Sequence, residues 1–360
     1  MSQESFSSNR LSEWEMGKKC MSVTIKDVAK LANVAPSTVS RVIANNPRIS
    51  EKTKRKVREA MEELGYHPNF IARSLANKSS DVLGIVMPKS GDGSFLNPFF
   101  STVMKGLSQA AHEDLYGLQI TTGISDDGIF DEVEKMIHGG RVDGVILLYS
   151  KVDDAVLDYL YKKDFPFVVI GKPPMHDSSI THVDNDNFQA GKDVARYLLA
   201  NGHKDIAFIG GSAHLVVTIE RMRGYEEALR EAGIPIAKEY AIHEDFMLEG
   251  GKEAVKRLMN LKNPPSALVV ADDFMALGVL NMLDEMDISV PDDISVVSFN
   301  NVLISQLSKP PLSSVDIGIE TLGYEAVKLL ISKIKNPKGP TMRMIIPHQL
   351  VIRSSVAKKN

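Results

Sequence analysis

The chain of 360 residues is longer than a single core of about 100 to 200 residues, so we expect two or three domains. Its composition, 43% hydrophobic and 24% charged, is typical of globular proteins and excludes a wholly disordered, collagen-like or membrane-embedded chain. No apolar run approaches the roughly 18 residues of a transmembrane helix, and residues 1–22 lack the apolar core of a secretory signal, so we expect a cytoplasmic protein. The single cysteine, Cys20, excludes an internal disulfide and a cysteine-based zinc site.

Charge is distributed unevenly along the sequence. Residues 22–79 carry a formal net charge of +6, whereas residues 80–360 carry −10. A basic head on an acidic body is typical of a protein whose head contacts a polyanion. A solvated basic helix face would give the same count, so both interpretations stay open at this point.

Helix start and stop signals in the basic head predict three short helices. Thr24 can cap the first helix with Asp27 three positions later, and Asn33 tolerates the left-handed conformation of a tight turn. Pro36 suits the first position of a second helix, where its missing N–H group is not needed. Ser50 can cap the third helix.

The second helix, from Pro36 to about Ala44, would place valine and isoleucine on one face and polar side chains on the other. Two helices joined by a turn of about three or four residues form a helix-turn-helix, whose second helix reads the major groove. The expected outward side chains are Ser37, Thr38, Ser40 and Arg41. Arg41 could form a bidentate contact with guanine. The alternative is a three-helix bundle without a role in DNA binding.

The segment from Thr24 to Ile43, TIKDVAKLANVAPSTVSRVI, resembles the head of the lactose-repressor (LacI/GalR) family of bacterial transcription regulators. Asn33 replaces the usual turn glycine, and Ala35 replaces the usual serine, a lost helix cap worth about 1 kcal/mol. The resemblance implies a homodimer that binds double-stranded DNA at a near-palindromic operator. The residues expected to contact DNA are Thr24, Pro36, Ser37, Thr38, Ser40, Arg41, Asn45, Ser50, Asn69, Ala72, Arg73 and Leu75.

A short helical stretch and a polar linker follow the head over residues 67–80. A helix of about eight residues is marginal alone in water, so we expect it to order against a partner. The resemblance implies that the partner is the second subunit's hinge, over the minor groove at the operator centre, with Leu75 inserted between base pairs. Alternatively, Leu75 packs on its own domain.

From Val82 onward, short apolar strands alternate with amphipathic helices, which predicts a parallel α/β architecture. The fold class is therefore an all-α helix-turn-helix head followed by an α/β body, and the body resembles the two-lobed periplasmic binding proteins with parallel sheets. The expected strands are 82–87, 118–122, 142–148 and 167–170 in one lobe and 206–209, 267–270 and 294–299 in the other. The expected domains are a disordered extension (1–22), the helix-turn-helix domain (23–66), the hinge helix and linker (67–80), the effector-binding and dimerisation domain (81–355) and a tail (356–360).

Such sheets bind ligands at the carboxyl ends of their strands, and two lobes create a cleft. Asp273 follows a predicted strand and matches the family's effector-binding aspartate; a carboxylate there can accept two hydroxyl hydrogen bonds from a sugar. Its alternative role is to cap the next helix. Arg221 matches the family's effector-contacting arginine. The other effector candidates are Phe99, Phe100 and Phe246, which could stack on a sugar ring or belong to the core, and Asp186.

Signs of an enzyme are missing from the sequence. It has no GxSxG elbow, P-loop, HExxH or strand-linked GxGxxG motif, and His112, His138, His203 and His214 lack metal-ligand spacing. We therefore expect no catalytic residue, no cofactor and no metal. A free-standing sugar receptor stays an alternative, but it leaves the basic head unexplained.

The predicted function is a DNA-binding transcription regulator, a repressor more readily than an activator, controlled by a small molecule in the interlobe cleft. Segments around residues 36–50 and 299–301 look most like the maltose-operon regulator branch of the family, which implies maltose or a maltodextrin as the effector. The alternatives are a different sugar or a protein corepressor in carbon catabolite control. The absence of leucine heptads after Arg353 argues against a coiled-coil tetramer.

Overall fold

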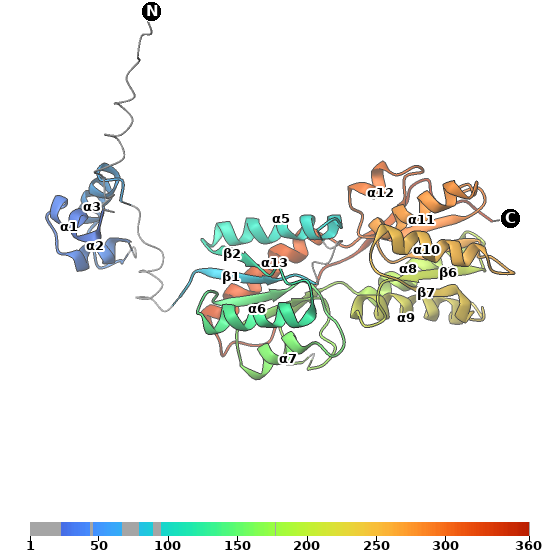
Figure 1. Cartoon of the computed structure of the whole chain (residues 1–360), viewed down its shortest axis with the longest axis horizontal. Helices are drawn as coiled ribbons and strands as arrows, with labels where there is room; N and C mark the ends of the chain where they lie inside the picture. The colour runs from blue at the N-terminus through green and yellow to red at the C-terminus, as the bar shows by residue number, and fades with distance from the viewer. Residues whose placement is uncertain (1–22, 44–45, 67–78, 89–94, 177, 360) are drawn as a thin grey trace, which may run out of the picture. The chain divides into compact units, whose positions relative to one another are not determined.

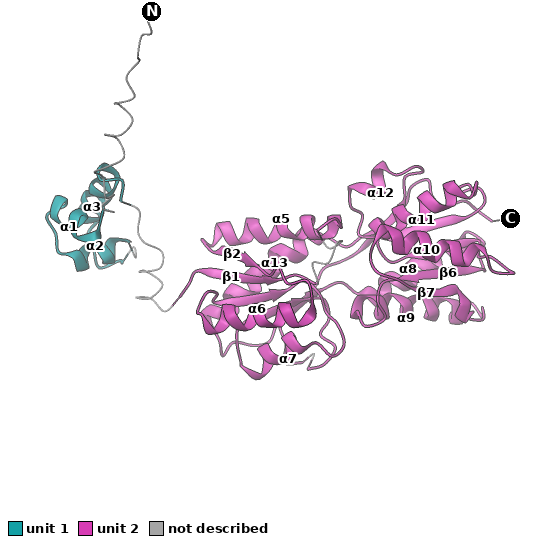
Figure 2. Ribbon diagram, viewed as in Figure 1, with its two compact units in different colours: residues 1–78 teal, residues 79–360 magenta. Residues whose placement is uncertain are grey.

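The computed structural model describes residues 23–43, 46–66, 79–88, 95–176 and 178–359. The expected extension over 1–22, Asn45, and the hinge residues Asn69, Ala72, Arg73 and Leu75 lie outside the described residues. The chain divides into two compact units, residues 1–78 and 79–360, which Figure 2 shows in separate colours. Within the described ranges, none of the helices has both the length and the apolar character needed to cross a bilayer.

The first unit, called the head, contains α1 (Ile25–Leu31), α2 (Pro36–Ile43) and α3 (Glu51–Glu63). They enclose a small core whose fully buried members are Val28, Val39 and Val57. Local signals set the helix ends: Asn33 turns the chain at φ 50° between α1 and α2, and Gly65 lies at φ 60° after α3. The three helices and the turn agree with the sequence prediction.

The second unit, called the body, consists of two lobes, each built on a six-stranded sheet (Figure 1). The N-lobe sheet has the order β11-β5-β4-β3-β1-β2 and is parallel throughout. The C-lobe sheet has the order β12-β10-β9-β8-β6-β7, with β12 alone antiparallel. The strands are β1 (Val82–Val86), β2 (Gly117–Ile120), β3 (Gly144–Leu147), β4 (Phe167–Ile170), β5 (His182–Asp184), β6 (Ile206–Gly210), β7 (Ala241–His243), β8 (Ala267–Val270), β9 (Ser295–Phe299), β10 (Ser313–Asp316), β11 (Arg343–Ile345) and β12 (Gln349–Val351).

Helices cover both sheets. In the N-lobe they are α5 (Pro98–Glu113), α6 (Asp126–His138), α7 (Ala155–Lys162) and α13 (Ile319–Lys335). In the C-lobe they are α8 (Asn187–Ala200), α9 (Val216–Glu231), α10 (Leu248–Met259), α11 (Asp273–Glu285) and α12 (Leu303–Leu307), with a short 3-10 turn over Lys238–Tyr240. Strands β3, β4, β6 and β8, which lie away from the sheet edges, are buried along their whole length, as expected for parallel sheets covered on both faces.

Helices α8 and α9 approach each other closely because glycine lies at their crossing. A Cβ atom added to Gly191 would stand 2.1 Å from the carbonyl oxygen of Arg221, and one added to Gly224 would stand 1.9 Å from that of Phe188. Only glycine permits this contact. The crossing fixes the position of Arg221 on α9.

Among the described residues of the body, the chain crosses between the lobes three times. The first crossover joins β5 to α8, the second joins β10 to α13, and the third joins β11 to β12. Both lobes are therefore assembled from distant parts of the sequence.

The structure corrects several details of the prediction. Five strands of three or four residues, β5, β7, β10, β11 and β12, were not expected. Helix α9 begins at Val216, so Arg221 lies in its second turn. The expected tail is packed on the C-lobe as far as it is described, since the Lys359 N–H group donates to the Asn201 carbonyl at 2.8 Å.

Candidate DNA-reading helix and interlobe effector site

Helix α2 presents a short polar face to solvent. Ser37, Ser40 and Arg41 are exposed and Thr38 is half-buried, while Val39 and Val42 point into the core. Pro36 occupies the first position of the helix, as predicted. The exposed face therefore carries hydroxyl groups and a single guanidinium and no carboxylate, which suits contact with phosphates and base edges.

Two of the expected DNA-contacting side chains act as helix caps. The Thr24 hydroxyl donates to the Asp27 carboxylate at 2.7 Å, and the Thr24 N–H group donates to the same carboxylate at 2.9 Å. The Ser50 hydroxyl accepts from the Thr53 N–H group at 3.3 Å. Both residues are exposed, so capping occupies these hydroxyls without burying them.

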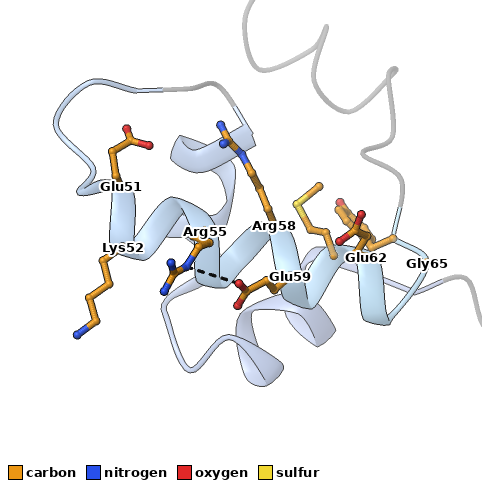
Figure 3. A pocket seen from close by; sticks show the side chains of 9 residues that line it. Glu51, Lys52, Arg55, Arg58, Glu59, Glu62 and Gly65 are labelled. Atoms are coloured by element: carbon orange, nitrogen blue, oxygen red, sulfur yellow. Dashed lines mark ion pairs between the residues drawn. The ribbon is translucent and has the colours of Figure 1, made fainter.

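The outward face of α3 differs from that of α2 because its charges are mixed. Figure 3 shows Glu51, Lys52, Arg55, Arg58, Glu59 and Glu62 along this face. Arg55 pairs with Glu59 at 3.6 Å, an exposed contact between residues one turn apart. Alternating charges of this kind are typical of a solvated helix surface, which leaves α2 as the better candidate for reading DNA.

In the body, the lobes meet through Asn97 and Asp272. Asn97 caps α5, since its Oδ1 accepts from the Phe99 N–H group at 3.0 Å, and its Nδ2 donates to Asp272 Oδ2 at 3.1 Å. Asp272 caps α11 through Oδ1, which accepts from the Phe274 and Met275 N–H groups at 2.8 and 3.1 Å. Asp272 Oδ2 also accepts from Asn300 Nδ2 at 2.7 Å. This oxygen therefore holds two amide donors, one from each lobe.

Arg221 lies beside this cluster and is 3% exposed. Its Nε donates to Asn187 Oδ1 at 3.0 Å, its Nη1 donates to the Ala271 carbonyl at 2.6 Å, and its guanidinium lies 4.2 Å from the centre of the Phe299 ring. Burial lowers the pKa of Arg221 to about 10, against the opposing effect of nearby carboxylates, so the side chain stays charged at neutral pH.

Asp184 lies on the other side of Asn187. It is 8% exposed, and its Oδ1 accepts from Asn187 Nδ2 at 2.9 Å. Burial raises the pKa of Asp184 to about 6, although neighbouring N–H groups and Arg221 favour the charged form. Burial also raises the pKa of Asp272.

Asp273, predicted as the effector carboxylate or as a helix cap, does not cap α11. The cap of α11 is Asp272, and Asp273 is fully buried within the C-lobe. Its Oδ1 accepts from the Ser298 and Ser314 hydroxyls at 2.5 and 2.7 Å, and its Oδ2 accepts from the Val302 N–H group at 2.8 Å. Both oxygens are thus bonded inside one lobe, and Asp272 is the carboxylate that reaches the other lobe.

The structure separates the remaining candidates. Phe99 and Phe100 stand edge to face in the first turn of α5, with ring centres 5.2 Å apart, and both are half-buried on the core. Phe246 covers Gly211 at the end of β6, where an added Cβ atom would lie 2.5 Å from its ring. Asp186 is exposed and caps α8, accepting from the Gln189 N–H group at 2.8 Å. Asp186 is therefore a surface cap.

Backbone bonds join the lobes at a second place. The Val152 N–H group donates to the His214 carbonyl at 2.9 Å, and the Val216 N–H group donates to the Ser150 carbonyl at 3.0 Å. These bonds frame an antiparallel bridge between Lys151 and Leu215.

The described residues contain no cluster of histidine, cysteine and acidic side chains able to hold a metal ion.

Asn97, Asn300 and Asp272 were not identified from the sequence. Two asparagines in loops give no recognisable pattern, because only the fold brings residues so distant in sequence together. The sequence analysis did single out the Asp272-Asp273 pair. Which of the two carboxylates caps α11 depends on the residue at which the helix begins, and the helix begins at Asp273.

A helix-turn-helix head joined to a two-lobed body places the protein in a class of bacterial DNA-binding regulators. Residues 24–69 match the bacterial regulatory proteins of the lacI family, and residues 195–356 match a periplasmic binding protein-like domain. The chain is 39% identical over 334 residues to the HTH-type transcriptional regulator MalR of Streptococcus pneumoniae, covering 92% of this chain and 99% of that protein. The protein therefore belongs to the lacI family of transcription regulators. The curated relatives that it matches are transcription regulators and not enzymes.

Solved structures agree with this assignment. A complex of the transcriptional regulator CelR with cellobiose is 30% identical, with a TM-score of 0.73, covering 92% of this chain and 99% of that one. A structure from Staphylococcus aureus, described as a probable maltose operon transcriptional repressor, is also 30% identical, with a TM-score of 0.71, covering 77% of this chain and 98% of that one. The fold class predicted from the sequence is confirmed.

Proposed function

We propose that this regulator acts as a homodimeric repressor whose operator affinity is set by a neutral sugar, maltose or a maltodextrin, bound between the lobes beside Asp272. The contact between Asn97 and Asp272 carries the proposal, because a buried carboxylate oxygen that accepts amide donors from both lobes can accept sugar hydroxyls instead. The relatives named for maltose regulation and the cellobiose complex of CelR support a sugar of this kind.

The proposed effector site comprises Asp272 and Asn300 from the C-lobe and Asn97 from the N-lobe, with Phe99 and Phe246 as aromatic walls. Arg221 holds the Ala271 carbonyl and thereby the strand end that precedes Asp272. Its charge also compensates the buried carboxylates around it. Amide and carboxylate groups can pair with several hydroxyls of one sugar at once.

The proposed coupling follows from exchange at Asp272. A sugar hydroxyl that replaces the Asn97 amide leaves the carboxylate paired, so the lobes can separate or rearrange without an unsatisfied buried charge. A sugar that prefers one lobe arrangement shifts the equilibrium toward it, and operator affinity changes by the same coupling factor.

In the proposed DNA complex, α2 enters the major groove with Arg41 on a base edge and Ser37 and Ser40 on phosphates or bases. The expected roles of Asn69, Ala72, Arg73 and Leu75 in the minor groove belong to this proposal. Two-fold symmetry of the dimer implies a near-palindromic operator.

The test is operator binding by fluorescence anisotropy at one salt concentration, using palindromic sites near the protein's own gene, with and without maltose. A change in operator affinity with maltose is the expected result. If maltose leaves operator affinity unchanged but another sugar or a protein corepressor alters it, that molecule is the effector in place of maltose. Absence of sequence-specific binding would contradict the assignment of α2 as the reading helix.

A further inference from the structure

One side chain in the body links the three crossovers between the lobes: it belongs to the first and donates to the other two. Asn185 lies in the first crossover, between β5 and α8, and is 4% exposed. Its Nδ2 donates to the Ile317 carbonyl in the second crossover at 2.8 Å and to the Ile346 carbonyl in the third at 2.9 Å. A side-chain amide has two N–H donors, and here each one holds a different crossover.

Backbone contacts around Asn185 hold the same junction together. The Ile346 N–H group donates to the Asp184 carbonyl at 2.8 Å, which joins the third crossover to the first. In the second crossover, Gly318 adopts φ 63°, and an added Cβ atom would lie 3.0 Å from the Ile346 side chain. The second and third crossovers are therefore packed against each other.

Asp316 fixes the second crossover from the C-lobe side. Its Oδ1 accepts from the Gly318 N–H group at 2.8 Å, and its Oδ2 accepts from Asn301 Nδ2 at 3.0 Å. Asn301 follows Asn300, whose side chain contacts Asp272 in the effector site. A short chain of polar contacts thus runs from Asp272 to the second crossover.

We propose that Asn185 is the positioning residue of the interlobe hinge, holding the three crossovers at a fixed spacing so that the lobes turn about them as one joint. The proposal rests on the proposed function, in which an effector at Asp272 changes the lobe arrangement. A hinge confines large backbone changes to a few residues, and three linked passages permit fewer motions than three independent ones. Without the amide, the crossovers bend independently, and effector binding changes operator affinity by a smaller factor.

The test uses the full chain and Asn185→Asp, which keeps the side-chain shape but turns both N–H donors into an oxygen facing two carbonyl oxygens. The quantity measured is the ratio of operator affinities with and without maltose. We expect this ratio to fall about fivefold or more toward one, within the usual range of coupling factors. A partial loss of folded protein affects both affinities equally and leaves the ratio unchanged.

Asn201→Asp is the matched control. Asn201 Nδ2 donates to the Tyr197 carbonyl at 2.8 Å at the end of α8, within one lobe, so its loss should leave the ratio at the wild-type value. Asn185→Ala, which adds no charge, should behave like Asn185→Asp. If both Asn185 variants keep the wild-type ratio, the amide is only structural and the proposal is overturned.

A second measurement does not depend on the effector. Hydrogen exchange at the Ile346 N–H group and over residues 316–319 should become about tenfold faster in Asn185→Asp and stay unchanged in Asn201→Asp. Unchanged exchange in Asn185→Asp would overturn the hinge proposal. If exchange accelerates but wild-type protein responds to no sugar, the hinge proposal stands and the proposed effector fails.

Discussion

The Asn97 amide donates to the Asp272 carboxylate at 3.1 Å although 175 positions separate the two residues. Each also caps a helix of its own lobe, Asn97 on α5 and Asp272 on α11. Two helix N-termini from different lobes are thus joined through their cap side chains. Because each cap is bonded to its own helix, a ligand that separates this pair while both caps stay in place must also move the helices that carry them, which links the proposed effector site to the lobe arrangement.

Asp272→Asn should weaken sugar binding while preserving the fold. Asparagine and aspartate are about equally good helix caps, so the α11 N-terminus stays capped. The lost charge removes a charge-assisted acceptor, and we expect maltose affinity to fall about tenfold or more, with a stability loss of about 1–2 kcal/mol. Titration calorimetry and thermal unfolding measure these quantities.

Asp186→Asn is the control for Asp272→Asn, because Asp186 caps α8 from an exposed position. It should leave maltose affinity unchanged. Equal affinity for maltose in wild type and Asp272→Asn would contradict the proposal that Asp272 binds the effector.

Much of the head could be predicted because its signals are local. Thr24 with Asp27, Asn33 in the turn, Pro36 at the start of α2 and Ser50 before α3 each act within about four residues of chain. Most of the predicted body strands, such as β3, β4 and β8, are buried apolar runs. The missed strands β5, β7, β11 and β12 have only three residues each, and β10 reads SSVD, so none of them is an apolar run.

The proposed effector site could be predicted only in part because tertiary contacts assemble it. Arg221 was identified as a candidate, and its burial depends on the α8–α9 crossing at Gly191, which no short motif reveals. Asp273 was selected because it matches the family's effector-binding aspartate, and the two adjacent carboxylates do not show in the sequence that Asp272 caps α11 and bonds to Asn97. Asn97 and Asn300 reach Asp272 from separate loops.

Arg41→Ala should reduce operator binding without changing the body. Arg41 is the exposed guanidinium on α2, and loss of a bidentate base contact should cost about 1–3 kcal/mol and relax specificity at one base pair. Arg58→Ala, on the mixed-charge face of α3, is the control and should change operator affinity by less. Anisotropy titrations against single-base operator variants measure both effects, and an equal loss in the two variants would contradict the role of Arg41.

Stability should depend on pH through Asp184. Burial raises the pKa of Asp184 to about 6, whereas its ordinary value is 3.8, so between these values the folded chain binds more protons than the unfolded chain. The contribution of Asp184 to the free energy of unfolding therefore falls as pH rises through this window, by an amount on the order of 3 kcal/mol.

Urea unfolding of wild type and Asp184→Asn at about pH 4 and pH 7 isolates this contribution, because these values lie close to the ordinary pKa and about one unit above the shifted one. Asparagine does not titrate, so the stability of wild type relative to the variant should fall at the higher pH. A constant difference between the two proteins would show that Asp184 has an ordinary pKa in the folded state.

The charges around Arg221 should make the regulator respond to neutral sugars in preference to anionic ones. Asp184 and Asp272 both lie near its single guanidinium, and their fields act on it. An anionic sugar in this site would be buried against these carboxylates, which is costly in a low-dielectric setting. Maltose should therefore raise the unfolding temperature, whereas glucuronate and glucose 6-phosphate at the same concentration should not. In Asp272→Asn, the difference between the unfolding temperatures with maltose and with the anionic sugars should be smaller. A larger rise in the unfolding temperature of wild type with glucuronate than with maltose would contradict the charge argument.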